Sequence, residues 1–207
     1  MATATHDIKE PLVSIAMCTY NGAAWLPQQL DTLLNQTWQN LEIIICDDAS
    51  TDHTPALLEE YARKDSRIKV YRNEQNLGYN KNFEKACRLT TGEFIAISDQ
   101  DDIWELQKIE AMMKGRDPEA VFWYSLSRDF WGDAPVREEE HKPIRYYEGS
   151  MPEKLAFDSP IHGHAAMFHR SLLDTAVPFP ENVYYDWWLS MVASFFFKDT
   201  ATTEIYT

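Results

Sequence analysis

Residues Asn40–Thr54 read NLEIIICDDASTDHT and contain a strand, a loop and the start of a helix. The run Leu41–Cys46 is almost continuously apolar, as expected of a parallel strand that is covered on both faces. The loop after it begins with two carboxylates, and Thr54 followed by Pro55 is typical of a helix N-terminus. This order of elements predicts an α/β fold with a parallel sheet.

The same order recurs on both sides of this segment. Strands are predicted over 12–18, 41–46, 68–71 and 94–98, and helices over 26–34, 55–64, 80–89 and 103–113. Such alternation implies right-handed crossovers that place helices on the faces of a mostly parallel central sheet. From about Glu119 the alternation breaks down, although strands are expected within 120–127 and 164–170 and a helix within 184–197.

We therefore predict a single domain over residues 10–194, with a regular half over 10–115 and an irregular half over 116–194. Residues 195–207, FFFKDTATTEIYT, differ in character from the chain before them. We interpret them as a tail of doubtful native origin, and an ordinary helix end with a frayed tail is the alternative.

The net charge, the cysteines and the apolar segments of the chain bear on its binding partners and its location in the cell. The 207 residues carry a net charge of −14, which disfavours binding to a nucleic acid backbone. The three cysteines form no C-x-x-C pair, and they are expected to be reduced packing residues. The N-terminus lacks the layout of a signal peptide, and no apolar stretch approaches the length of a transmembrane helix. We expect a cytoplasmic protein, with peripheral association at the inner face of a membrane left open.

Two acidic clusters follow predicted strands directly: Asp47-Asp48 and Asp99-Gln100-Asp101-Asp102. In parallel sheets, ligands bind outside the carboxyl ends of the strands. Carboxylates gathered there suit Mg²⁺ or Mn²⁺, which readily share oxygens with a diphosphate. Asp48 can also accept a hydrogen bond from the imide N–H of uracil or thymine. The alternative is that these residues only cap turns and helix N-termini.

Four segments together carry a resemblance to a known family: CTYNGAAWL, NLEIIICDDASTDHT, NEQNLGYNKN and GEFIAISDQDDIW. In this order they resemble the signatures of family 2 glycosyltransferases with the GT-A (Rossmann-like) fold. The bacterial enzymes that build O-antigen and capsule, including rhamnosyltransferase-like members, are the most similar group. The resemblance covers roughly residues 10–192 and is specific over the first ~105.

The resemblance implies a role for several residues. Thr19, Tyr20 and Asn21 would line the nucleotide pocket, Asp48 would read the pyrimidine base, and Asp99 would lie near the ribose. Asp101 would bind the metal, Mn²⁺ or Mg²⁺, and Asp186 would be the catalytic base. Tyr185 stands where the family usually has Glu, which puts the acceptor contacts in doubt more than the base.

The chemistry supports these roles independently. A metal bridging the diphosphate stabilises the leaving group, and a carboxylate on the opposite side takes the proton of the attacking hydroxyl. One base with in-line attack implies inversion at the anomeric carbon. From the residues alone, donor contacts are predicted for Arg72, Asn76 and Gly78, with ordinary turn chemistry as the alternative. His164 is predicted to contact the donor or the acceptor, and a zinc site at the H-x-H spacing of His162 and His164 is the weaker alternative. Trp187 and Trp188 are predicted to stack on the acceptor, although aromatics at helical spacing more often belong to a core.

The sequence thus predicts a metal-dependent, inverting glycosyltransferase that uses a UDP- or dTDP-sugar and a glycan or lipid-linked glycan acceptor. A nucleotidyltransferase of the same fold is a weaker alternative, because CTYNGAAW lacks a Gly-rich, basic phosphate loop. The alternative from another class is a non-catalytic or truncated remnant that binds nucleotide or glycan without turnover.

Overall fold

The computed structural model describes residues 10–127, 130–131, 134–135, 155, 161–197 and 200–206. Its centre is a seven-stranded sheet with the strand order β3-β2-β1-β4-β8-β5-β9. The strands of this sheet are β1 (Val13–Thr19), β2 (Leu41–Asp47), β3 (Ile68–Arg72), β4 (Phe94–Ser98), β5 (Phe122–Leu126), β8 (Ala166–His169) and β9 (Thr200–Tyr206). β8 runs antiparallel to both neighbours, and the other pairs are parallel. This is the mostly parallel sheet that the sequence predicts.

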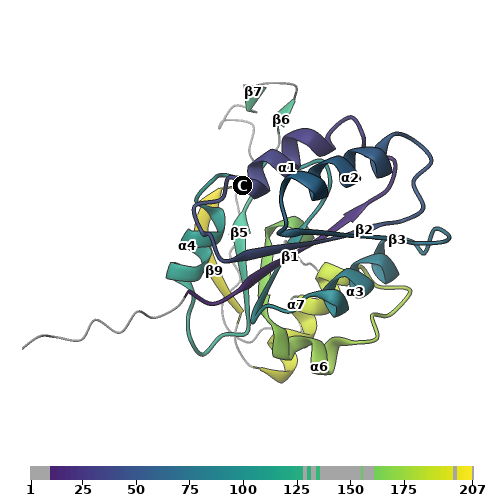
Figure 1. Ribbon diagram of the computed structural model, residues 1–207. Helices are drawn as coiled ribbons and strands as arrows, with labels where there is room; N and C mark the ends of the chain where they lie inside the picture. The colour runs from purple at the N-terminus through teal and green to yellow at the C-terminus, as the bar shows by residue number, and fades with distance from the viewer. Residues whose placement is uncertain are drawn as a thin grey trace, which may run out of the picture.

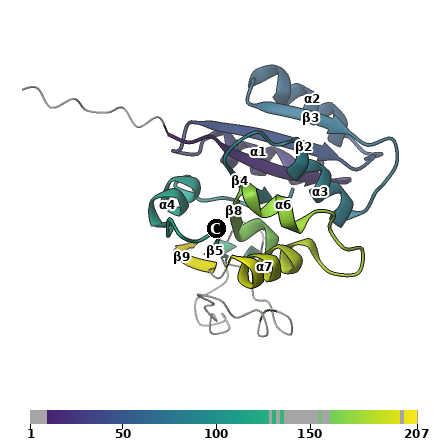
Figure 2. The same ribbon diagram turned by 90° about the horizontal axis from the view of Figure 1, so that it is seen from below.

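Helices cover both faces of the sheet (Figure 1). They are α1 (Leu26–Leu34), α2 (Thr54–Lys64), α3 (Tyr79–Leu89), α4 (Lys108–Gly115), α6 (Leu173–Ala176) and α7 (Tyr185–Phe196), with short 3₁₀ turns at Gly163–Ala165 and Arg170–Leu172. A two-stranded ribbon joins β6 (Phe130–Trp131) and β7 (Ala134–Pro135). Apolar residues of α1, α2 and α4 pack on one face, and those of α3, α6 and α7 pack on the other, the layer that Figure 2 shows from below.

Two local expectations are corrected. The helix expected over 103–113 begins only at Lys108, because the backbone before it bonds to α1 and the turn after α1: the N–H of Trp104 donates to Thr32 Oγ1 (3.2 Å), and the carbonyl of Leu106 accepts from the N–H of Thr37 (2.8 Å). His53 is the N-cap of α2, so Thr54 is already helical, and its hydroxyl accepts a hydrogen bond from the N–H of Gly22 instead. Residues 200–206, part of the tail of doubtful native origin, form β9 beside β5. The sequence also predicts a solvated loop over 137–143 and a short helix over 151–157. Both segments lie outside the described residues, Leu155 excepted.

All three cysteines are free, as predicted, with Cys46 and Cys87 buried. None of the helices in the described ranges has the length and apolarity needed to cross a bilayer.

Glu42 joins three strands at the end of the sheet opposite the acidic clusters. Its carboxylate is 5% exposed and accepts hydrogen bonds from Ser14 Oγ (2.6 Å), Thr91 Oγ1 (2.8 Å) and Lys69 Nζ (3.0 Å). Burial by itself raises the pKa of this carboxyl, but the hydrogen bonds outweigh it and lower the pKa from 4.5 to about 2. The anionic form of Glu42 therefore stabilises the fold.

We expect Glu42→Gln to lower the free energy of unfolding by about 2 kcal/mol at pH 7. Because the folded pKa is depressed, this stabilisation is complete above about pH 4.5 and is lost as the pH falls toward 2. Urea unfolding of both proteins at pH 7 and at pH 3 measures it. If the difference in free energy of unfolding between the wild type and Glu42→Gln were the same at pH 7 and at pH 3, the stabilising role of the Glu42 carboxylate would be contradicted.

Candidate functional site

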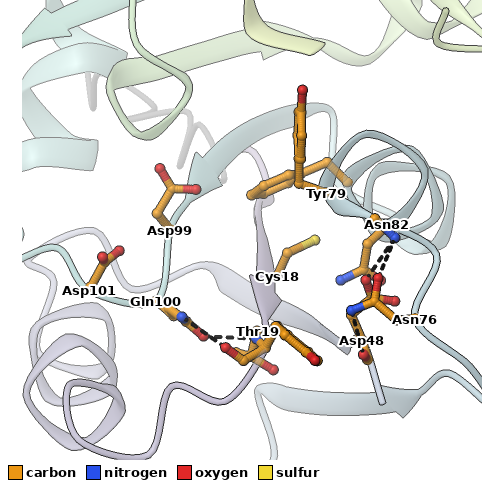
Figure 3. Close-up of a pocket in the computed structure, with 12 residues that line it drawn as sticks. Cys18, Thr19, Asp48, Asn76, Tyr79, Asn82, Asp99, Gln100 and Asp101 are labelled. Atoms are coloured by element: carbon orange, nitrogen blue, oxygen red, sulfur yellow. Dashed lines mark hydrogen bonds between the residues drawn. The ribbon is translucent and has the colours of Figure 1, made fainter. Parts of the chain in front are cut away.

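A cavity of about 390 Å³ opens where β1, β2 and β4 end. Its lining residues are Cys18, Thr19, Tyr20, Asp48, Asn76, Gly78, Tyr79, Asn82, Phe83, Asp99, Gln100 and Asp101. In Figure 3, Asp99 and Asp101 lie on one side, Asp48, Asn76 and Asn82 lie on the other, and Cys18 lies between them. The prediction that the two acidic clusters meet at the carboxyl edge of the sheet is confirmed.

Asp48 organises one wall of this cavity. Its Oδ1 accepts hydrogen bonds from Asn73 Nδ2 (2.7 Å) and from the N–H of Leu77 (2.8 Å), and its Oδ2 accepts one from the N–H of Gly78 (3.0 Å). Gly78 can form this contact at the start of α3 because its φ of +80° suits glycine. A carboxylate accepts about four hydrogen bonds, so Asp48 retains capacity for one more donor from the cavity.

Of the three residues predicted in the first loop, two line the cavity and one holds the neighbouring loops together. Thr19 and Tyr20 line the cavity, and the hydroxyl of Thr19 donates to Asp47 Oδ1 (3.0 Å). Asn21 is not among the lining residues. Its backbone has a φ of 49°, and its Oδ1 accepts a hydrogen bond from the N–H of Thr51 (2.8 Å). Asn21 therefore holds the loops after β1 and β2 together.

Gln100 links the two sides of the cavity, a role that the sequence did not reveal. Its Oε1 accepts from the N–H of Tyr20 (2.9 Å), and its Nε2 donates to the carbonyl of the same residue (3.2 Å). A Cβ on Gly22 would lie 2.2 Å from Gln100 Oε1, so the glycine leaves room for this amide. The only signal in the sequence was that glycine, which an ordinary turn also explains.

Asp99, Asp102 and His164 form a cluster at the edge of the cavity. His164 Nδ1 lies 3.6 Å from Asp99 Oδ2 and 3.8 Å from Asp102 Oδ1, and one ligand atom from each residue falls within 4.8 Å of the others. Asp102 Oδ2 is buried, and no hydrogen-bond partner for it occurs in the part of the chain that the structure describes. These oxygen and imidazole donors fit a hard divalent cation. Asp101, the predicted metal ligand, lines the cavity outside this cluster.

Charge within the cluster shifts two pKa values. Burial raises the pKa of Asp102, and the nearby Asp99 raises it further, against the effect of His164. Burial alone would lower the pKa of His164, but the nearby carboxylates of Asp99 and Asp102 raise it above its ordinary value. A negative potential therefore surrounds this cluster, as a cation site requires.

Lys108 lies beneath the same cluster. It is 1% exposed, its Nζ donates to the carbonyl of His164 (2.5 Å), and the ammonium lies 3.7 Å from the ring centre of Trp104. Burial lowers its pKa to about 7, against the opposing effect of Asp102 and Asp99. It fixes the backbone at His164. The sequence did not reveal this role, because a lysine within an amphipathic pattern predicts a solvated helix face.

Asp186 lies in the first turn of α7. Its Oδ1 accepts from the N–H of Trp187 (2.7 Å), and its Oδ2 accepts from the N–H of Gly163 (3.1 Å). Burial raises the pKa of this carboxyl, and the charge of Asp99 adds to the effect, while the two backbone hydrogen bonds oppose it. Asp186 is therefore a fixed carboxylate of raised pKa near the acidic edge of the cavity.

Asn80 fixes the approach to α7. Its Nδ2 donates to the carbonyls of Val183 (2.7 Å) and Pro180 (3.0 Å), and its Oδ1 accepts from the N–H of Tyr185 (3.0 Å). Three hydrogen bonds from one side chain on α3 thus hold the start of a helix about 100 residues away. The sequence placed Asn80 on a helix but gave no partner for it.

Other predicted contacts are placed as follows. Asn76 and Gly78 line the cavity, whereas Arg72 is not among the lining residues, and its Nη2 donates to the carbonyl of Ser50 (2.9 Å).

The indole of Trp188 donates to the carbonyl of Ala176 (2.6 Å), and that of Trp187 donates to the carbonyl of Leu155. Both indole N–H groups are therefore occupied by the protein itself. Tyr185 is buried, and its ring centre lies 4.2 Å from that of Phe83.

Comparison with known proteins gives a consistent result. Residues 14–176 match the model of Glycosyl transferase family 2. An "Uncharacterized glycosyltransferase" of Haemophilus influenzae is 27% identical over 86% of this chain and 59% of its own length. The Escherichia coli protein WfaP, a "UDP-Glc:alpha-D-GlcNAc-diphosphoundecaprenol beta-1,3-glucosyltransferase", is 36% identical over 58% of this chain and 48% of its own.

A solved structure confirms the fold. "Mannosyltransferase PcManGT from Pyrobaculum calidifontis in complex with GDP-Man and Mn2+" superposes with a TM-score of 0.70 at 23% identity, over 94% of this chain and 55% of that one. The expected GT-A architecture is therefore correct. The chain spans about half to three fifths of the length of these three proteins.

Proposed function

The chain belongs to glycosyl transferase family 2, and on this premise we propose that it moves a sugar from a nucleoside diphosphate sugar to a hydroxyl group of a glycan acceptor. The observation that carries the proposal is the cavity at the carboxyl ends of β1, β2 and β4, with carboxylates on both sides. Asp48 on one wall suits the base, and Asp99 and Asp101 on the other suit the ribose and the diphosphate.

We propose a uridine or thymidine donor, because the free acceptor capacity of Asp48 matches the imide N–H that these bases present and cytosine lacks. The printed name of WfaP, with its UDP-Glc donor, supports a uridine nucleotide. Thr19, Tyr20, Asn76 and Gly78 complete the walls around the nucleotide. Asn21 and Arg72 act behind them, through their hydrogen bonds to the loop after β2.

The residues that would hold a divalent cation, Mn²⁺ or Mg²⁺, are Asp99, Asp102 and His164, with Asp101 adjoining them on the cavity wall. The complex of PcManGT with Mn²⁺ is consistent with this assignment. When bound, the cation supplies positive charge that stabilises the departing diphosphate. Lys108 holds the carbonyl of His164 and thereby fixes the turn that carries the imidazole.

Asp186 is the proposed general base. The acceptor oxygen forms a bond to the anomeric carbon as the bond from that carbon to the phosphate oxygen breaks, and the hydroxyl proton passes to the Asp186 carboxylate. A single base and in-line displacement give inversion. The N–H groups of Gly163 and Trp187 orient the carboxylate, and its raised pKa makes it a stronger base than an exposed aspartate. The acceptor is proposed to be a surface glycan that is lipid-linked, as the diphosphoundecaprenol in the name of WfaP suggests.

Calorimetric titration of UDP, dTDP and GDP, each with and without Mn²⁺, tests the proposal. We expect metal-dependent binding of UDP or dTDP, and an affinity at least about tenfold weaker in Asp101→Asn, because one carboxylate near the diphosphate and the metal is neutralised. Asp174→Asn, the same change on the exposed side of α6, is the control.

If none of the three nucleotides binds to the folded protein, the proposal is overturned. Binding without transfer to any acceptor would instead favour a remnant that binds nucleotide but does not turn over.

A further inference from the structure

Two exposed tyrosines meet between the cavity and the candidate base. Tyr79, the first residue of α3, lines the cavity (Figure 3), and Tyr184 comes two residues before Asp186. Their ring centres are 5.8 Å apart with an angle of 24° between the planes, so the rings stack. Tyr79 is 52% exposed and Tyr184 is 60% exposed. The pair therefore presents open aromatic surface beside the site.

The hydrophobic core does not account for this pair, because more than half of each residue faces solvent. What fixes the rings is the backbone on either side of them. Asn80, next to Tyr79, binds the carbonyl of Val183 and the N–H of Tyr185, the two neighbours of Tyr184. A platform that is ordered before the ligand arrives loses little conformational entropy on binding.

The pair also lies at the end of the site where the acceptor must bind, next to Asp186. Tyr184 is the N-cap of α7 and Asp186 lies in the first turn of that helix, so the stacked rings and the carboxylate lie at the same helix end. The hydroxyl that attacks must lie against Asp186, and the sugar that bears it must therefore lie beside residues next to Asp186. Trp187 and Trp188, predicted for this role, already donate their indole N–H groups to protein carbonyls.

We propose that Tyr79 and Tyr184 form the platform on which the accepting sugar of the acceptor stacks through its apolar C–H face. This proposal rests on the proposed function and deepens it. The sugar is a neutral pyranose, because the Asp186 carboxylate beside the position repels a uronate or another acidic sugar. Stacking on a tyrosine places the ring while leaving its hydroxyl groups free for Asp186.

Saturation-transfer NMR tests the proposal with methyl β-D-glucopyranoside as the probe, in the presence of UDP and Mn²⁺. Methyl β-D-glucuronide is the acidic counterpart. We expect transfer to the glucoside but not to the glucuronide, and a loss of roughly tenfold in glucoside affinity in Tyr79→Ala and in Tyr184→Ala. Tyr79→Phe and Tyr184→Phe should retain binding, because they keep the ring. Trp25→Ala removes an equally exposed aromatic outside the pair and is the control.

UDP affinity, measured by calorimetry on the same variants, separates the two proposals. It should stay unchanged in Tyr184→Ala and Trp25→Ala, whose residues are not among those that line the cavity, if the platform serves the acceptor. Glucoside binding that persists in both alanine variants, or a wild type that binds UDP but no glucoside, would overturn the platform. So would a Tyr184→Ala variant that loses UDP affinity as well as glucoside binding. A wild type that fails to bind UDP contradicts the proposed function itself.

Discussion

Asp186→Asn is expected to lower kcat by about 10²- to 10⁴-fold while the affinity for UDP stays within about twofold of the wild type. The amide keeps the size of the side chain, and its Oδ1 can still accept one of the two hydrogen bonds that the N–H groups of Gly163 and Trp187 donate to Asp186. It cannot take the proton of the attacking hydroxyl. A coupled assay that monitors the release of UDP from the donor sugar measures the change in kcat. Asp174→Asn is the matched control.

The pH profile gives a second measurement of the same role. The base works only when it is ionised, so kcat of the wild type should fall on the acid side as Asp186 becomes protonated. Burial raises the pKa of this carboxyl, so that acid limb should lie at higher pH than for an ordinary aspartate. The limb should be absent from the residual activity of Asp186→Asn. An identical limb in both proteins would assign the titration to another group.

The location of the site could be predicted because it depends on strand direction alone. Apolar runs such as Leu41–Cys46 indicate buried parallel strands, and parallel strands bring their carboxyl ends to one edge. Asp48, Asp99 and Asp101 therefore had to lie near one another, whatever the loops did. The structure places all three around one cavity.

The supporting residues could not be predicted, because their partners are distant in sequence. Asn80 binds residues about 100 positions away, and Gln100 binds the backbone 80 positions before it. A lysine on an amphipathic helix ordinarily faces solvent, yet the Nζ of Lys108 lies against the carbonyl of His164 under the acidic cluster. No local pattern encodes such contacts. Those of Asn80 and Lys108 depend on how the irregular second half folds back onto the first, and that of Gln100 depends on how the loops after β1 and β4 meet.

Trp187 and Trp188 likewise show that an aromatic residue beside the candidate base cannot be assigned to sugar binding from the sequence alone. Aromatic residues beside a candidate base suggest sugar binding, but burial and hydrogen bonding decide which aromatic rings are available. Trp188 packs against the core between α6 and α7, whereas Tyr79 and Tyr184 remain exposed. The assignment of the platform therefore needed the three-dimensional contacts and not only the sequence.

Gly163→Ala is expected to lower kcat by about 10²-fold, because the glycine sits directly over a buried ring. A Cβ at this position would lie 2.0 Å from Tyr185 Oη and 2.6 Å from its Cζ. Tyr185 is 6% exposed and packs against Phe83, so the ring has little room to move away. The backbone at Gly163 must shift instead, and that shift withdraws the N–H that orients Asp186.

A double-mutant cycle tests whether this steric cause is correct. In the Tyr185→Leu background the colliding hydroxyl and ring are gone, so adding Gly163→Ala should cost at most about threefold in kcat. Thermal unfolding of all four proteins identifies any variant whose loss of activity reflects loss of structure. If Gly163→Ala were equally harmful in both backgrounds, contact with Tyr185 would not be the reason that this position is glycine. The expected non-additivity would instead show that contact with Tyr185 determines the backbone position of Gly163, whose N–H binds Asp186.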